Sequence, residues 1–154
     1  MKVSQIKKDI QSKTVAGLNG AGEDIQDLFK EVLQRDFYDA YNPKLYDRKN
    51  IIPNEVQKSS AVSNGSGASV EVYYDAGAGG HPRPTAKDIF GYEHHVDYSE
   101  EEILTAVMSG YHMVGISGRG AKTANTWFNT LAEFDAKKDE IIPRNLRAAG
   151  LPVH

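Results

Sequence analysis

The sequence predicts an α+β domain in which helices pack on one face of a small antiparallel β-sheet. Three observations predict this organisation. Apolar residues recur with the helical period near both ends of the chain. Between them, two stretches of alternating hydrophobicity are joined by a glycine-rich turn, which is the pattern of a β-hairpin. No internal repeat or change of composition divides the chain, so we expect a single domain over residues 1–154.

Two helices are expected before the hairpin. The first is short and covers 3–15, and glycines over 17–22 are expected to end it. The second covers 23–41 and is strongly amphipathic, with acidic residues in its first turn. The apolar residues that indicate these helices are Val3, Ile6 and Ile10 in the first and Ile25, Leu28, Phe29, Val32, Leu33, Phe37 and Ala40 in the second.

The hairpin is predicted from strands over 55–62 and 68–75. The turn over 64–67, Asn-Gly-Ser-Gly, supplies residues that tolerate the positive φ angles of a tight turn. We expect at least one edge of this small sheet to be left uncovered by its own chain, which makes it a site for pairing with a neighbouring copy. In the second strand, Ala68, Val70, Val72 and Tyr74 are expected to be buried and Ser69, Glu71 and Tyr73 to be exposed.

The rest of the chain is expected to add loops, helices and one further strand. In chain order these are a surface loop over 76–87, a helix from the capping box at 99–102 to Gly110, a strand over 111–116, a mobile turn over 117–122, a helix over 124–138 and a last helix from Pro143 through Ala149. Trp127, Leu131 and Phe134, at helical spacing, indicate the helix over 124–138.

The composition argues against several classes of protein. The chain has no cysteine, which excludes disulfides, thiolate zinc sites and a cysteine nucleophile. Its net charge of −3 argues against a protein that binds nucleic acid through clustered lysines and arginines. The sequence has neither an apolar run long enough to cross a bilayer nor the apolar region of a signal peptide at its charged N-terminus. We therefore expect no membrane partner.

Histidines in the second half of the chain invite a metal-site interpretation, because histidine and carboxylate side chains are zinc ligands. Adjacent His94 and His95 would point to opposite sides of a strand, however, and His95 with Asp97 supplies only two ligands. His81 and His112 stand far from them in the sequence. We therefore expect no metal and no other cofactor.

The segment Gly115–Thr123 looks at first like a phosphate-binding loop. That motif needs glycine directly before its lysine, and Ala121 stands before Lys122 here. No serine-nucleophile elbow is present, and no pair of residues is indicated as a nucleophile with its base. We expect a protein without enzymatic activity. The alternative is a small hydrolase, or a nucleotide- or metal-binding protein, that uses this loop or the histidine-rich segment.

A crowded aromatic segment, 37–48, follows the amphipathic helix. From the residues alone, Tyr41, Pro43, Tyr46 and Arg48 predict a structural corner in which tyrosine rings and a guanidinium pack against the helix end. The spacing Tyr-x-Pro-x-x-Tyr-x-Arg, between an amphipathic helix and a hairpin, also resembles the N-terminal half of small neck and tail-completion proteins of tailed bacteriophages. The resemblance extends over about residues 25–74.

This resemblance implies a structural virion protein at the head–tail junction, assembled in the host cytoplasm. Copies of it would form a ring, a hexamer or a dodecamer, between portal or head-completion proteins and tail proteins, with passing contact to DNA in the channel. Glycine- and proline-rich loops over 76–92 and 117–122 are expected to carry intermolecular contacts. A third interpretation is an adaptor that binds one partner without forming a ring. The candidate interface residues are Tyr73, Tyr74, His81, Arg83, Phe90, Tyr92 and Arg119.

Overall fold

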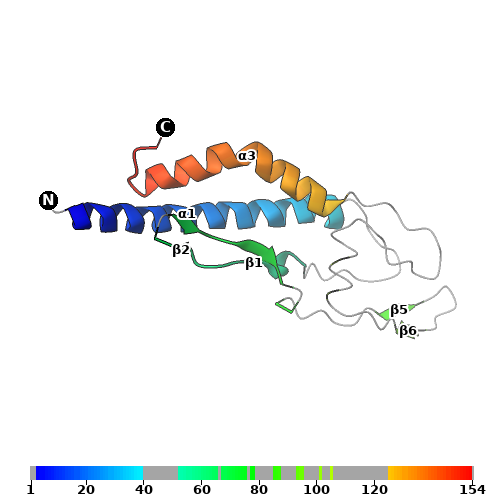
Figure 1. Ribbon diagram of the computed structural model, residues 1–154. Helices are drawn as coiled ribbons and strands as arrows, with labels where there is room; N and C mark the ends of the chain where they lie inside the picture. The colour runs from blue at the N-terminus through cyan, green and yellow to red at the C-terminus, as the bar shows by residue number, and fades with distance from the viewer. Residues whose placement is uncertain are drawn as a thin grey trace. The chain divides into compact units, whose positions relative to one another are not determined.

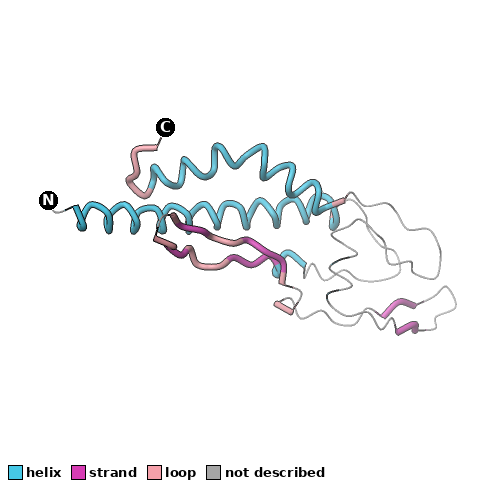
Figure 2. The backbone as a smooth tube through the Cα atoms, in the orientation of Figure 1, coloured by secondary structure: helices cyan, strands magenta, loops and turns pink. Residues whose placement is uncertain are grey.

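The computed structural model of the protein describes residues 3–39, 52–65, 67–75, 77–78, 85–87, 93–95, 101, 105 and 125–153. The expected α+β class is confirmed, because long helices occur together with short antiparallel strand pairs (Figures 1 and 2). The helices are α1 (Val3–Leu33), a π-helix (Gln34–Tyr38), a 3-10 helix (Ile52–Glu55) and α3 (Thr126–Ala148). The strands are β1 (Val56–Lys58), β2 (Val62–Ser63), β3 (Ala68–Ser69), β4 (Val72–Tyr74), β5 (Thr85–Lys87) and β6 (Glu93–His95).

By their contacts the residues group into two compact units. The first comprises Met1–Phe29, Gln57–Tyr73 and Ala132–His154, and the second comprises Lys30–Val56 and Tyr74–Leu131. Of the apolar face predicted for the amphipathic helix, the residues from Ile25 to Leu33 are buried, and the burial of Phe37 and Ala40 lies outside what the structure describes. The buried apolar side chains of the described residues are Ala21, Ile25, Leu28, Phe29, Ala61 and Ile141 in the first unit and Val32, Leu33 and Val56 in the second.

α1 is one continuous helix, so the expected break at the glycines over 17–22 is wrong. These glycines stand where other segments of the first unit pass close to the helix. A Cβ atom built on Gly17 would lie 2.9 Å from the Cα atom of Leu146, and one built on Gly22 would lie 2.8 Å from Cγ2 of Val70. Such approaches leave no room for a side chain, so the glycines serve close packing and the helix continues through them.

The α-helical part of this segment ends at Leu33, and a π-helix follows over Gln34–Tyr38. The backbone N–H of Asp39 donates to the carbonyl oxygen of Gln34 at 2.8 Å, and Nε2 of Gln34 donates to Oδ1 of Asp39 at 2.9 Å. These two hydrogen bonds close the wide turn of the π-helix at its C-terminal end. The helix end predicted at Tyr41 lies outside the described residues.

The predicted hairpin is confirmed as two short strand pairs that follow one another along the same two segments. β1 pairs with β4, and β2 pairs antiparallel with β3. In the second pair, Val62 lies opposite Ser69 and Ser63 lies opposite Ala68. The strands are shorter than the predicted 55–62 and 68–75, because the ladder is interrupted between the two pairs.

The turn of the hairpin is closed by Asn64 and Gly67. The backbone N–H of Asn64 donates to the carbonyl oxygen of Gly67 at 3.0 Å, and the N–H of Gly67 donates to Oδ1 of Asn64 at 2.9 Å. Gly65 has a φ angle of 88°, as the Asn-Gly sequence predicts. The predicted alternation is also confirmed: Ala68, Val70, Val72 and Tyr74 are half-buried, whereas Ser69, Glu71 and Tyr73 are exposed.

A further antiparallel pair, β5 with β6, places Thr85 opposite His95 and Ala86 opposite His94. The surface loop predicted over 76–87 is therefore wrong at its last three residues, which form β5. The glycines and prolines that precede these residues conceal so short a strand in the sequence.

α3 is a single helix, so the separate last helix predicted to begin at Pro143 is wrong. Pro143 lies inside α3, where it removes one backbone donor. Contacts with α1 in the first unit stabilise the helix just beyond this point. Nη2 of Arg144 and Nδ2 of Asn145 both donate to Oδ2 of Asp24, at 2.9 and 2.5 Å. Tertiary packing thus outweighs the local preference of proline for a helix start.

Several predicted elements lie mainly outside the described residues. Of the helix expected after the capping box at 99–102, Glu101 and Thr105 are described, and both are helical. The predicted strand over 111–116 and the turn over 117–122 are not among the described residues. Among the helices that the structure describes, none is long and apolar enough to cross a membrane.

Candidate functional site

The first turns of α1 extend beyond the point where α3 ends (Figure 1). In the first unit, the chain turns at Gly150, with a φ angle of 87°, and a Cβ atom built there would lie 3.5 Å from Cε of Lys13. We call residues 3–12, the part of α1 before this contact, the α1 arm. Every residue from Val3 to Ile10 in this arm is exposed to solvent.

The α1 arm presents aliphatic side chains on one of its faces. Val3, Ile6 and Ile10 follow one another at helical spacing, and between 43% and 83% of each residue is exposed. The α1 arm is therefore amphipathic, and the described part of the chain leaves its apolar side largely uncovered. The sequence predicted this spacing, but it did not indicate that these side chains are exposed.

A groove of about 360 Å³ lies between the α1 arm and the tip of the hairpin, within the first unit. The hairpin tip is held near the arm by a hydrogen bond of 3.4 Å from Nε2 of Gln11 to the carbonyl oxygen of Gly65. The glycines at the tip leave the groove open on the hairpin side. The groove is lined by Val3, Ile6, Lys7, Ile10, Gln11, Thr14, Ser63, Gly65, Gly67 and Ala68.

The α1 arm and the turn after it carry more positive than negative charge. Lys7 and Lys8 are exposed, and Lys7 lines the groove. Lys13 is engaged by Asp9, with 2.7 Å between Nζ and Oδ2. Because Asp9 is the single acid among these lysines, the rim of the apolar groove is basic.

The first two turns of α3, in the second unit, expose a second apolar surface. Trp127, Phe128 and Leu131 are all exposed there, and we call these three residues the α3 patch. The side of the helix that faces the interior carries polar residues, and of these Thr126 and Thr130 are fully buried. The Thr130 hydroxyl donates to the carbonyl oxygen of Thr126 at 2.7 Å, which removes much of the cost of burying it.

The α3 patch is held in place by neighbours in the same unit. Oδ1 of Asn125 accepts a hydrogen bond of 2.9 Å from the backbone N–H of Phe128, which is an N-cap contact. The rings of Tyr74 and Trp127 meet edge to face, with centroids 6.1 Å apart and planes at 62°. One side of Trp127 therefore packs against the hairpin residue, and the rest of it stays accessible.

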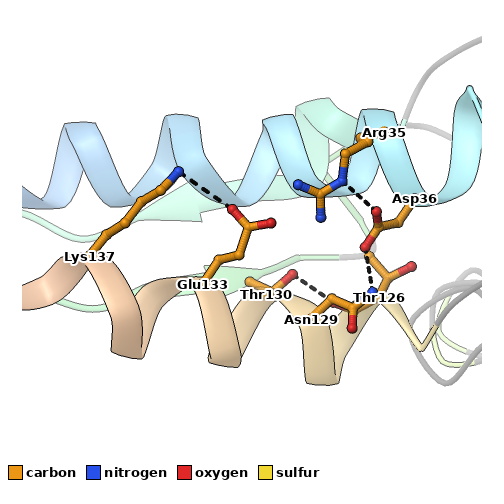
Figure 3. Close-up of polar contacts among 7 residues, drawn as sticks. All are labelled: Arg35, Asp36, Thr126, Asn129, Thr130, Glu133 and Lys137. Atoms are coloured by element: carbon orange, nitrogen blue, oxygen red, sulfur yellow. Dashed lines mark hydrogen bonds and ion pairs between the residues drawn. The ribbon is translucent and has the colours of Figure 1, made fainter.

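Beside the patch, the second unit contains a buried polar contact between the π-helix and α3. Asp36 accepts hydrogen bonds of 2.7 Å from Nε of Arg35 and from Nδ2 of Asn129, on different oxygens (Figure 3). Burial raises the pKa of the Asp36 carboxyl, but the hydrogen bonds from Arg35 and Asn129 outweigh it and hold the pKa below its ordinary value. An ionised carboxylate with both oxygens engaged is suited to anchoring α3 and poorly suited to taking up a proton.

Tyr74, like Asp36, has a shifted pKa in this unit. Burial raises the pKa of its hydroxyl to about 12. The phenol therefore stays neutral across the physiological range. Tyr74 was predicted both as a buried residue of the hairpin and as an interface residue, and its half-buried position against Trp127 agrees with the first of these.

The other predicted site residues divide into two groups. Tyr73 is exposed, as expected for a candidate interface residue. The remaining ones lie outside the described residues: Tyr41, Pro43, Tyr46 and Arg48 of the aromatic corner, and His81, Arg83, Phe90, Tyr92 and Arg119 of the candidate interface. Among the residues that the structure describes, no group of three or more histidine or acidic side chains is arranged to hold a metal ion.

The described residues thus offer two exposed apolar surfaces, the α1 arm with its groove and the α3 patch, and both suit contacts with protein. No protein-family model matches this chain, and neither a curated protein nor a solved structure matches it.

Proposed function

We propose that this chain is a structural virion protein of a tailed bacteriophage. In this proposal copies of it form a ring, a hexamer or a dodecamer, at the head–tail junction, where the ring joins or completes head and tail. Portal or head-completion proteins and tail proteins are its neighbours, and DNA passes through the channel. The spacing of Tyr41, Pro43, Tyr46 and Arg48, between an amphipathic helix and a hairpin, is the sequence feature that supports the phage assignment.

The observation that carries the assembly part of the proposal is the exposed apolar face of the α1 arm. Exposed aliphatic side chains on a free helix end are costly to a protein that remains alone in water. Val3 is 83% exposed, and Ile6 and Ile10 extend the same face toward the groove. A subunit of a ring covers such a face against its neighbour, where a standard interface buries about 800 Å² on each partner.

The experiment is a measurement of molar mass in solution by analytical ultracentrifugation over a range of protein concentrations. The proposal predicts a defined multimer in which all subunits are equivalent. It also predicts that an antibody against the chain labels purified particles at the junction between head and tail. A monomer at all concentrations, or labelling elsewhere on the particle, would overturn the proposal.

A further inference from the structure

We propose that the α1 arm of one copy docks on the α3 patch of a second copy, with Phe128 entering the groove beside the arm. This inference rests on the proposed function, because it names the two surfaces through which copies assemble. Both surfaces are apolar and exposed among the described residues, and each occurs once per chain. The contact therefore joins two different surfaces of neighbouring copies.

The charge on the α1 arm argues against pairing between two arms. A two-fold contact of this kind would place the exposed Lys7 and Lys8 of both copies close to one another. Like charges at short distance across an interface disfavour the complex. The occupant of the groove is therefore an apolar surface with an exposed carboxylate beside it.

The α3 patch has this chemistry. Asp135 follows Leu131 by four residues and Phe128 by seven, so its carboxylate lies on the same face of α3 as the patch. Its side chain is 74% exposed and pairs with Lys138 on the adjacent turn. Docking of the arm brings Lys7 and Lys8 toward the exposed Asp135 carboxylate, which they share with Lys138 at the rim of the apolar contact.

Size and shape also favour this occupant. Phe128 is 67% exposed, more than Trp127 or Leu131, so its ring stands out from the patch. The groove has a volume of about 360 Å³, and Val3, Ile6 and Ile10 give it one aliphatic wall, which suits contact with one aromatic ring. Aromatic residues that fill a pocket on the partner contribute much of the energy of protein interfaces.

A contact between two different surfaces has a consequence for assembly. Each copy uses its arm on one neighbour and its patch on the other, so the contact repeats from copy to copy. The contacts close into a ring when the rotation from one copy to the next is a whole-number fraction of 360°. This geometry is what a ring at the head–tail junction requires.

The test uses two full-length variants, Ile6→Asp on the arm and Phe128→Asp on the patch. Each puts a carboxylate in place of an exposed apolar side chain, so native folding is expected and is checked by circular dichroism. Val62→Asp is the matched control, because Val62 is 59% exposed and belongs to neither surface. If Phe128→Asp lowers the helix content, Leu131→Asp replaces it on the same patch.

We expect each variant alone to be monomeric and an equimolar mixture of the two to form a heterodimer, because one intact arm and one intact patch remain. The control should assemble like the wild type. The inference is overturned if the wild type assembles and either variant alone still does so, or if the mixture stays monomeric. Loss of assembly in Val62→Asp alone would instead place the contact on the hairpin. A wild type that is itself monomeric overturns both this inference and the proposed function.

Discussion

Nδ2 of Asn129 donates a hydrogen bond of 2.7 Å to Oδ2 of Asp36, which links α3 to the π-helix at the end of α1 within the second unit. Asp36 is 8% exposed, so this bond is made to a carboxylate that solvent hardly reaches. Hydrogen bonds to charged groups are stronger than those between neutral groups. We regard this contact as the anchor that holds the α3 patch in its observed orientation.

Replacement of Asn129 with alanine should therefore lower the free energy of unfolding by about 1.5–3 kcal/mol, the range for a hydrogen bond to a charged partner. Arg35→Ala should cost less, because half of the Arg35 side chain is exposed and its ion pair with Asp36 is screened by solvent. Urea denaturation of the two variants measures the difference. Equal losses would show that Asn129 has no special role.

The pH dependence of stability follows from the lowered pKa of Asp36. Its pKa lies below the ordinary value of 3.8 in the folded protein, so its contribution is complete above that value and is lost as the pH falls through the folded pKa. We expect the free energy of unfolding to decline below about pH 4. Asp36→Asn should show a smaller decline over the same range, and an unchanged decline would contradict the assignment.

Gly17 offers a test in which packing and helix propensity predict opposite signs. Alanine normally stabilises a helix relative to glycine by about 0.5–1 kcal/mol. A Cβ atom on Gly17 would lie 2.9 Å from the backbone of Leu146, so Gly17→Ala should instead destabilise the protein, by about 1–3 kcal/mol. Thermal denaturation measures the sign, and Ser12→Ala, at an exposed position of α1, is the control. A stabilised Gly17→Ala variant would show that α3 does not pack closely there.

The sequence predicted the hairpin correctly because its alternation and its Asn-Gly turn are local signals. The predictions at Gly17 and Pro143 were wrong because non-local contacts determine the structure at these positions. Glycine and proline were interpreted from their local preferences, whereas contacts between α1 and α3 decide both positions. Such contacts join residues more than a hundred positions apart and leave no periodic pattern in the chain.

The candidate surfaces were predictable only in part. The spacing of Val3, Ile6 and Ile10 is visible in the sequence, but their exposure beside the hairpin tip is a tertiary feature that the spacing does not show. The apolar spacing of Trp127 and Leu131 would normally indicate a buried side, and the structure buries Thr126 and Thr130 in its place. The Thr130 hydroxyl can be buried because it donates a hydrogen bond to the carbonyl oxygen of Thr126. Hydrophobicity alone would not have placed a threonine in the interior.

The contact between the α1 arm and the α3 patch is tested most directly by a reconstruction of the assembled protein by electron cryomicroscopy, at a resolution that separates helices. We expect a closed ring in which the first turns of α1 of each copy lie against the first turns of α3 of the next copy, with the side chain of Phe128 between them. A ring in which residues 3–12 of α1 remain in solvent, or one in which two copies of the α1 arm pair with each other, would contradict it.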